Sequence, residues 1–283
     1  MNDGSPMAAF VWRTLCPSID VLLDTAAIGD DTMDPEALHR FRVALRRLRC
    51  DLRSLRPFLD RARVKDLRKR LSELDELVRP IRDGDVMIER LSRTAGRVHT
   101  SIDAEIVESI HQLLTTQTDA ARFALREALE SGRFDGLLGD LAGLNADAIV
   151  VDADATRFVE DLQQLNKQLW REVRRLAKRL LDDADDDELH RLRVRAKRAR
   201  FLAEASTPEL GRSAKRRARD AERIQRVLGE HQDSVVFSRQ LLALPHPTTA
   251  HTLAIDALLA VETETRRKLR RRWRRRWHRA DRD

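Results

Sequence analysis

The feature that most constrains the fold is an internal duplication of a basic segment. Residues 39–49 read HRFRVALRRLR and residues 190–200 read HRLRVRAKRAR, so a histidine and several arginines recur 151 positions later. An acidic run precedes each segment, and Asp34 and Asp185 stand where a helix N-cap belongs. Because cap, charge and apolar spacing recur together, the pattern predicts a chain built from two copies of one helical unit.

The composition favours helices in both copies. Of the 283 residues, 42% are hydrophobic and 36% are charged, whereas aromatic residues account for only 4% and tyrosine is absent. Leucine, alanine, arginine and glutamate are typical of helices, while sheet proteins rely on aromatic and β-branched residues. We therefore predict an all-α fold, with a single domain over 1–283 made of repeats at 8–145 and 155–279 and a linker at 146–154.

A second duplicated motif predicts where helices break. LVRPIRDGDV (77–86) aligns with VLGEHQDSVV (227–236) at a shift of 150, which pairs Asp83 with Asp233. Aspartate often caps helices, and proline and glycine interrupt them, so both aspartates are expected in turns that precede a helix. The helices predicted around these turns cover 61–79, 85–98, 208–229 and 233–244.

The first duplicated segment has two contrasting faces when it is placed on a helix. At about 100° per residue, its basic side chains fall within an arc of roughly 80°, and apolar residues occupy the opposite side. The basic stripe of the first copy contains His39, Arg42, Arg46, Arg49 and Arg53. The second copy repeats the stripe with His190, Arg193, Lys197 and Arg200, and Glu204 follows one turn later.

Such stripes need a source of negative charge. Like charges three or four residues apart on a helix repel each other by a few tenths of a kcal/mol per pair, and the first stripe contains no carboxylate. Either the stripes bind an anionic partner, or they stay solvated, or they pair with acidic residues of neighbouring helices. Their duplication favours the anionic partner.

Two further groups of basic residues extend the candidate site. Lys65 and Lys69 align with Lys215 and Arg219 at the shift of 150, and they line either the same anion site or an outer solvated face. The run RRKLRRRWRRRW (266–277) is not duplicated, and nine of its first eleven residues are basic. As a helix it would extend the anion site, whereas as a tail it would bind nucleic acid or an acidic surface nonspecifically.

These motifs and their repetition resemble a known family. A helix with the pattern HxxRVxxRRxR, a later RDxDV or LGxxQD segment and the repeated unit are similar to the CHAD family, the conserved histidine α-helical domains, over about residues 8–279. The resemblance implies two helical bundles related by pseudo-twofold symmetry, whose basic helices line a shared groove or pore that binds inorganic polyphosphate without catalysis. The matching positions are His39, Arg42, Arg46, Arg47 and Arg49, and His190, Arg193, Lys197, Arg198 and Arg200.

The chemistry of these residues favours binding over catalysis. Arginine forks and lysine charges suit the phosphates of a linear polyanion, and a bound phosphate would favour the charged imidazole of His39 and His190. No glycine-rich phosphate loop, activated nucleophile or converging metal ligands are evident, so we expect no catalytic residue, metal or cofactor. The alternatives are a general polyanion or nucleic-acid binder that uses its Arg-rich C-terminal helix and, third, a phosphohydrolase that uses the two histidines.

The sequence also carries expectations about location. The two cysteines have no CxxC spacing, which fits a reducing compartment. The segment MNDGSPMAAFVWR lacks the basic start and apolar stretch of a signal peptide, and no stretch is apolar enough to span a membrane. We therefore expect a cytoplasmic protein, and polyphosphate granules are a further location that would suit the family.

Overall fold

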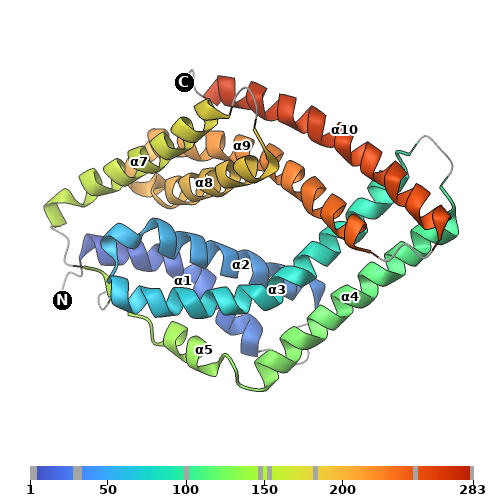
Figure 1. Ribbon diagram of the computed structural model, residues 1–283. Helices are drawn as coiled ribbons and strands as arrows, with labels where there is room; N and C mark the ends of the chain where they lie inside the picture. The colour runs from blue at the N-terminus through green and yellow to red at the C-terminus, as the bar shows by residue number, and fades with distance from the viewer. Residues whose placement is uncertain are drawn as a thin grey trace. The chain divides into compact units, whose positions relative to one another are not determined.

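The computed structural model describes residues 5–27, 34–98, 102–145, 149–151, 155–180, 184–244 and 248–280. Within these residues the chain is helical apart from turns and one isolated bridge between Leu59 and Val150, which confirms the all-α prediction. The helices are α1 (Pro6–Ala27), α2 (Pro35–Ser54), α3 (Arg61–Ala95), α4 (Ala104–Glu130), α5 (Asp135–Ala142), α7 (Phe158–Arg179), α8 (Asp186–Ala205), α9 (Thr207–Ala243) and α10 (Thr249–Ala280), as Figure 1 shows.

The two helices that carry the duplicated segment begin as the sequence predicts. The side chain of Asp34 accepts a hydrogen bond from the backbone N–H of Ala37 at 2.8 Å, and α2 begins at the next residue, Pro35. At α8, the backbone N–H of Glu188 donates to Asp185 at 2.6 Å. Each aspartate thus satisfies an N–H of the first turn that has no partner within the helix.

The predicted turns around Asp83 and Asp233 are wrong. Helix α3 continues through Pro80 to Ala95, and α9 continues through Asp233 to Ala243. The glycine of the first motif serves packing instead of a turn, because a Cβ atom at Gly84 would overlap the hydroxyl of Thr118 on α4. The non-helical residue of α9 is Gly211, whose φ of 59° is a conformation that glycine adopts without strain.

The chain folds into two compact units, each assembled from separated segments. Unit 1 comprises Met1–Arg79, Ala121–Trp170 and Lys197–Arg219, and unit 2 comprises Pro80–Ala120, Arg171–Ala196 and Asp220–Asp283. Both units therefore draw on both halves of the sequence, and the division into repeats at 8–145 and 155–279 stays a prediction. Of the predicted linker, 146–148 and 152–154 lie outside the described residues, while Val151 donates its backbone N–H to the carbonyl oxygen of Phe58 at 3.0 Å.

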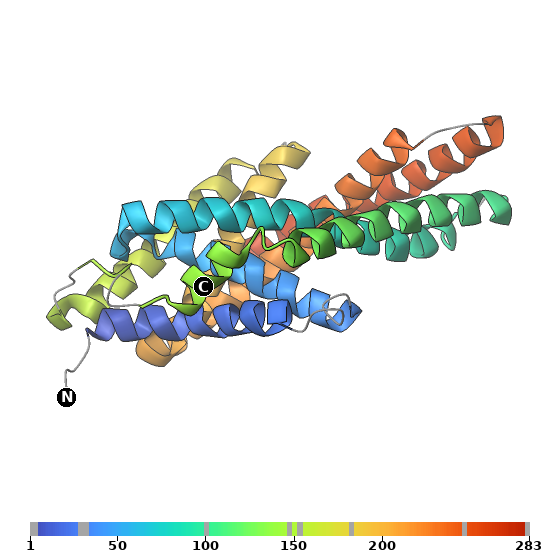
Figure 2. The same cartoon turned by 90° about the horizontal axis from the view of Figure 1, so that it is seen from below.

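Each unit has its own apolar core. In unit 1, α1 packs against α2 and α5, and the largest fully buried side chains include Phe10 and Phe41. In unit 2, α3, α4, α9 and α10 lie together (Figure 2). Their buried side chains form one cluster that includes Met87, Ile110 and Phe237. None of the described helices combines the length and apolar character that crossing a membrane requires.

A buried charged group also holds unit 2 together. Glu262 of α10 has no exposed surface and accepts hydrogen bonds from Arg90 at 2.6 Å, from Thr94 at 2.7 Å and from Ser234. Burial by itself would raise the pKa of Glu262, but the hydrogen bonds from Arg90, Ser234 and Thr94 lower it overall. This carboxylate therefore links α3, α9 and α10.

Candidate anion-binding site

Helix α2 displays the two faces that its sequence predicts. Its apolar side chains are buried, and they include Phe41, Leu45 and Leu48. On the opposite side His39 and Arg53 are exposed, whereas Arg42, Arg46 and Arg49 are half-buried. The stripe therefore lies at the surface of unit 1, with its central arginines partly covered by neighbouring helices.

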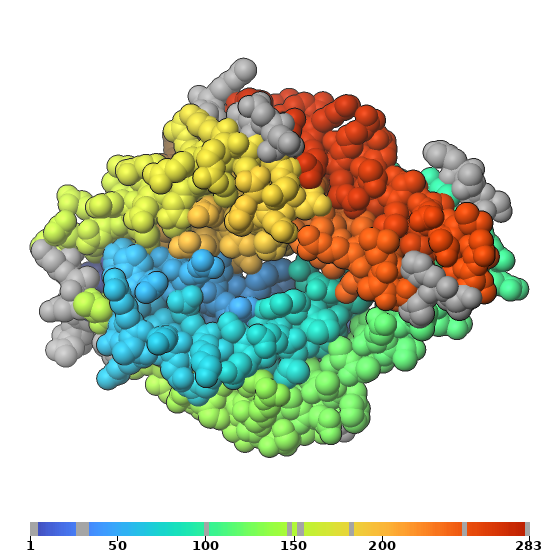
Figure 3. Space-filling view, viewed as in Figure 1, coloured from blue at the N-terminus to red at the C-terminus, as the bar shows by residue number. Residues whose placement is uncertain are grey.

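One edge of the α2 stripe faces α3. Arg49 forms an ion pair with Asp75 and donates a hydrogen bond to the hydroxyl of Ser72 at 3.1 Å. The Asp75 carboxylate also meets Arg79 at 3.3 Å. In unit 1 these segments adjoin, as the blue and cyan surfaces in Figure 3 show. Arg49 thus links α2 to α3 through the carboxylate of Asp75, a partner that the sequence analysis did not predict.

The other edge of α2 faces residues 197–205 of α8. Arg47 lies 3.5 Å from Asp51 and 3.4 Å from Glu204, and its guanidinium stacks 4.9 Å from the ring centroid of Phe201. Glu204 also accepts a hydrogen bond from Arg200 at 2.7 Å. One carboxylate is therefore shared by Arg47 and Arg200, the two predicted arginines at this edge.

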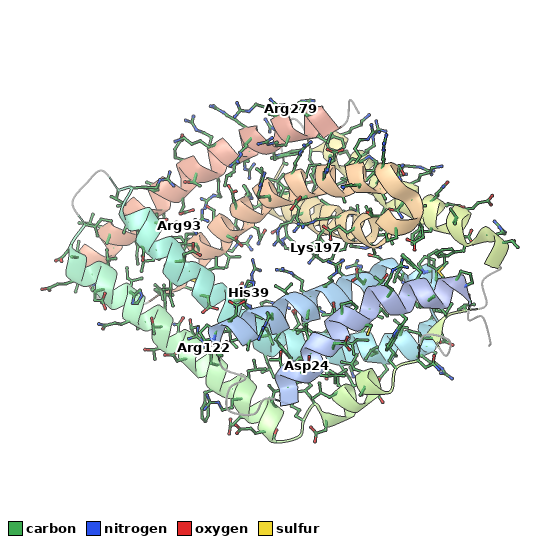
Figure 4. The ribbon with its side chains drawn as sticks, turned by 180° about the vertical axis from the view of Figure 1, so that it is seen from behind. Asp24, His39, Arg93, Arg122, Lys197 and Arg279 are labelled. Atoms are coloured by element: carbon green, nitrogen blue, oxygen red, sulfur yellow. The ribbon has the colours of Figure 1, made fainter. Side chains whose placement is uncertain are left out.

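Between these edges, basic residues of both duplicated segments come together. Lys197 precedes Phe201 by one turn of α8, and Phe201 and Glu204 contact Arg47 of α2. Burial raises the pKa of the Cys50 thiol of α2 to about 11, and the positive charges of Lys197 and Arg198 oppose that rise. By helical spacing, Arg42 and Arg46 lie between Arg49, which faces α3, and Cys50. Figure 4 shows His39 on α2 and Lys197 on α8 extending into the region between the two helices. We call His39, Arg42, Arg46, Lys197 and Arg198 the basic face of unit 1.

The remaining residues of the second stripe belong to unit 2. His190 and Arg193 precede the point in α8 at which the chain enters unit 1. Burial lowers the pKa of Arg193, and the positive charge of Arg82 lowers it further, while Asp233 and Asp83 oppose this. Arg82 pairs with Asp233 at 3.1 Å. The two aspartates expected as helix caps are therefore members of an ion-pair cluster inside unit 2.

The second recurring pair is exposed in unit 1. The side chain of Lys69 is 76% exposed and lies 3.8 Å from Glu73. Lys65, Lys215 and Arg219 are exposed as well. Their exposure is compatible with both interpretations that the sequence left open, an anion site and a solvated face.

Sequence reasoning missed Arg68, which adds to the charge near the α2 stripe. Burial lowers the pKa of Arg68, and the positive charges of Arg53, Arg56 and Arg49 lower it further. Arg68 precedes Ser72 by one helical turn, so the two residues share the face of α3 that meets α2. Only knowledge of the contact between Ser72 and Arg49 would have revealed this position.

The Arg-rich run at the C-terminal end is a helix with a structural inner side. Trp273 and Trp277 are buried in unit 2, and Arg270 pairs with Asp186 at 2.6 Å. The outer side exposes Lys268, Arg271, Arg275 and Arg279. As far as Ala280 the run is therefore an integral part of unit 2, and its outer arginines form a second basic surface.

Asp51, a buried carboxylate beside the basic face, has a raised pKa. Asp51 is 1% exposed, and burial raises its pKa to about 7 although Arg47 opposes the rise; the charge of Glu204 adds to it. Among the described residues, no cluster of three or more histidine, cysteine, aspartate or glutamate side chains is arranged to hold a metal ion. The site therefore consists of cations with a few carboxylates at its edges.

Comparisons with known proteins agree with this architecture. The uncharacterized proteins Rv2226 and MT2285 of Mycobacterium tuberculosis are each 29% identical over 255 residues, which is 85% of this chain and 46% of theirs. The chain thus spans less than half the length of these relatives. PptA from Streptomyces chartreusis has the same fold, with a TM-score of 0.80 at 18% identity, over 97% of this chain and 100% of that one.

A second solved structure and a family match settle the assignment. The crystal structure of the CHAD domain from the plant Ricinus communis has a TM-score of 0.74 and 26% identity, over 93% of this chain and 89% of that one. Residues 22–243, which are most of the chain and include the helices of both duplicated segments, match the CHAD domain family. The chain therefore belongs to the CHAD domain family.

Proposed function

We propose that this protein binds inorganic polyphosphate, without catalysing its cleavage or transfer, along the basic face of unit 1. The observation that carries the proposal is the meeting of both duplicated segments there, with His39, Arg42 and Arg46 from α2 and Lys197 and Arg198 from α8. The resemblance to the CHAD family implies the same ligand and a groove lined by both halves of the sequence. In this proposal, the ligand lies between α2 and residues 197–205.

The distribution of charge supports a long, thin anion. Carboxylates pair with arginines at the margins of the face, Asp75 with Arg49 and Glu204 with Arg47. The central positions of the first segment carry histidine and arginine but no carboxylate. A polyphosphate chain carries about one charge per phosphate, so it can neutralise successive cations along a helix while releasing its counterions.

The residues of the face also suit binding without chemistry. Arginine and lysine donate hydrogen bonds and positive charge, and neither activates a nucleophile at ordinary pH without a depressed pKa. The proposal assigns His39 as a donor to phosphate. A catalytic role for His39 would need a partner that positions its imidazole, whereas binding to phosphate needs no such partner.

A paired substitution tests the assignment. Each well-formed charge-assisted contact contributes about 1.5–3 kcal/mol, so Arg42→Ala with Arg46→Ala should weaken polyphosphate binding by about a hundredfold or more. The slope of log affinity against log salt should fall by about two counterions. Binding is measured by titration calorimetry at several salt concentrations, after circular dichroism confirms the fold.

The matched control removes the same charge elsewhere. Arg271→Ala with Arg275→Ala changes two exposed arginines of α10 and should reduce affinity far less. Substitution is preferable to deletion of this run, because deletion would remove Trp273 and Trp277 from the core of unit 2. Equal losses in both double variants, or a loss confined to the α10 pair, would reject the basic face as the site.

The outer surface of α10 supports one alternative function, nonspecific binding of nucleic acid. Arg271, Arg275 and Arg279 recur every fourth residue on an exposed side, about 6 Å apart along the helix. Such a row can meet the phosphates of a nucleic acid backbone without reading bases. If this were the main function, the α10 pair would lower affinity for duplex DNA strongly while the α2 pair would leave it unchanged.

A further inference from the structure

Unit 1 contains a pocket that is distinct from the centre of the basic face. It has a volume of about 550 Å³ and lies between α1 and α2, which pack side by side (Figure 1), with Ala205 of α8 also in its wall. Its apolar lining comes from Pro17 and Val21 on α1 and from Val43 and Ala44 on α2. Val43 is 38% exposed, so an apolar surface is accessible from solvent.

The rim of the pocket is cationic. Arg13 pairs with Glu209, and Arg47 pairs with Asp51 and Glu204, so these two charges are compensated. His39 and Arg40 line the same pocket and are exposed, and neither has a carboxylate partner among the residues that the structure describes. The phosphate of a bound ligand would supply negative charge to these two side chains.

Pro17 interrupts the backbone hydrogen bonds of α1 beside the pocket. Pro17 lies inside α1 and has no N–H, so it cannot donate to the carbonyl oxygen of Arg13 one turn earlier. Both residues line the pocket. A ligand that places an N–H or O–H group against this wall would satisfy an acceptor that the helix itself leaves without its usual donor.

We propose that the pocket between α1 and α2 binds a nucleoside phosphate. The base would lie between the aliphatic side chains of Pro17, Val21 and Val43, and the phosphates would meet His39 and Arg40. The volume falls within the range of small-molecule sites, which combine apolar walls with a few placed polar groups. An amino-bearing base such as adenine supplies the donor for the α1 wall, whereas an alkyl phosphate has an apolar body but no donor.

The test compares ATP with inorganic tripolyphosphate, which has the same number of phosphates and no base. ATP should bind at least tenfold more tightly at about 150 mM salt, where long-range attraction is screened, and ITP, which lacks the amino group, should bind several-fold more weakly than ATP. Equal affinities for ATP and tripolyphosphate, or tighter binding of dodecyl phosphate than of ATP, would overturn the proposal.

Two substitutions locate the site. Val43→Trp fills the pocket from an exposed position and should lower ATP affinity to that of tripolyphosphate, whose own affinity should not change. Leu242→Trp is the matched control, because Leu242 is an exposed apolar residue of unit 2, and it should alter neither affinity. Arg40→Gln supplies a second test that adds no bulk, and it should lower ATP affinity about fivefold to tenfold.

The test of the pocket can be separated from the test of polyphosphate binding. Among the residues predicted to bind polyphosphate, His39 and Arg47 also line the pocket. Long-chain polyphosphate should bind Val43→Trp as it binds the unaltered protein. Loss of ATP binding with polyphosphate binding intact supports both proposals. ATP binding by a protein that does not bind polyphosphate would reject the proposed function alone, and an unaltered ATP affinity in Val43→Trp would reject the pocket.

Discussion

Replacing Asp51 by asparagine should remove part of the pH dependence of the free energy of unfolding. Asp51 is buried on α2 beside Arg47, whose Nε lies 3.5 Å from the carboxylate. Burial raises the pKa of Asp51 from 3.8 to about 7, the charge of Arg47 opposes the rise, and Glu204 adds to it. Asparagine keeps the shape and polarity of the side chain and stays neutral at every pH.

The sign and size of the effect follow from the two pKa values. Between pH 3.8 and about 7 the folded protein holds a proton on Asp51 that the unfolded chain has released, so this group's contribution falls as pH rises. The full extra stability is present below pH 3.8 and is gone above about 7. Because one pKa unit corresponds to 1.36 kcal/mol, the rise is equivalent to about 4 kcal/mol. At pH 8, Asp51→Asn should therefore be more stable than the unaltered protein.

His231 in unit 2 imposes an opposite trend that the assay must separate. Burial lowers its pKa from 6.5 to about 4, although Asp186 opposes this, so its contribution is full above pH 6.5 and is lost as pH falls to about 4. The informative quantity is the difference in unfolding free energy between Asp51→Asn and the unaltered protein, from which His231 cancels. Guanidinium unfolding from pH 5 to pH 8 measures it.

The control is Asp24→Asn, the same chemical change at an exposed position of α1 in unit 1 (Figure 4). Its difference from the unaltered protein should not depend on pH in this range. The advantage of Asp51→Asn should grow from pH 5 to pH 7 and then level off. A difference that is constant with pH, or that shrinks as pH rises, would refute the argument that burial controls this carboxyl.

Three further outcomes are expected. Gly84→Ala should lower the stability of the protein by about 1–3 kcal/mol in thermal unfolding, because its Cβ would overlap Thr118. Gly139→Ala, in unit 1 and with open space around it, should cause no such loss, and equal effects would contradict the packing argument. Incubation with polyphosphate and Mg²⁺ or Mn²⁺ should release no phosphate, and release that disappears in His39→Ala would indicate an enzyme. Long-chain polyphosphate should displace duplex DNA at about 150 mM salt, and tighter binding of DNA would favour the α10 surface.

The parts of the fold that the sequence predicts are those set by local rules. Helix α2 begins after Asp34 because a side-chain oxygen can reach an N–H three residues ahead. Its buried and exposed faces follow from the period of 3.6 residues, which places Phe41 and Leu45 on one side and Arg42 and Arg46 on the other. These relations need no knowledge of any other helix.

The misread positions are those where packing between helices overrides the local pattern. A proline, an aspartate and a glycine in succession indicate a turn, yet α3 passes through Pro80, Asp83 and Gly84 unbroken. Tertiary contacts explain the difference, because Gly84 admits the close approach of Thr118 and the neighbouring Arg82 pairs with Asp233. Partners so distant in the sequence cannot be inferred from spacing.

Ion pairs with neighbouring helices distinguish Arg47 and Arg49 among the basic residues of the first duplicated segment. Arg49 and Arg47 each pair with a carboxylate from a neighbouring helix, so part of the hydrogen-bonding capacity of each guanidinium is already used in contacts within the protein. These two residues therefore act chiefly as ties between helices that fix the edges of the basic face. Removing either should therefore cost stability as well as affinity, which thermal unfolding and polyphosphate titration of each single variant would measure. Acidic neighbours thus offset the repulsion between like charges at the margins of the stripe, and in our proposal a bound polyphosphate adds further negative charge along it.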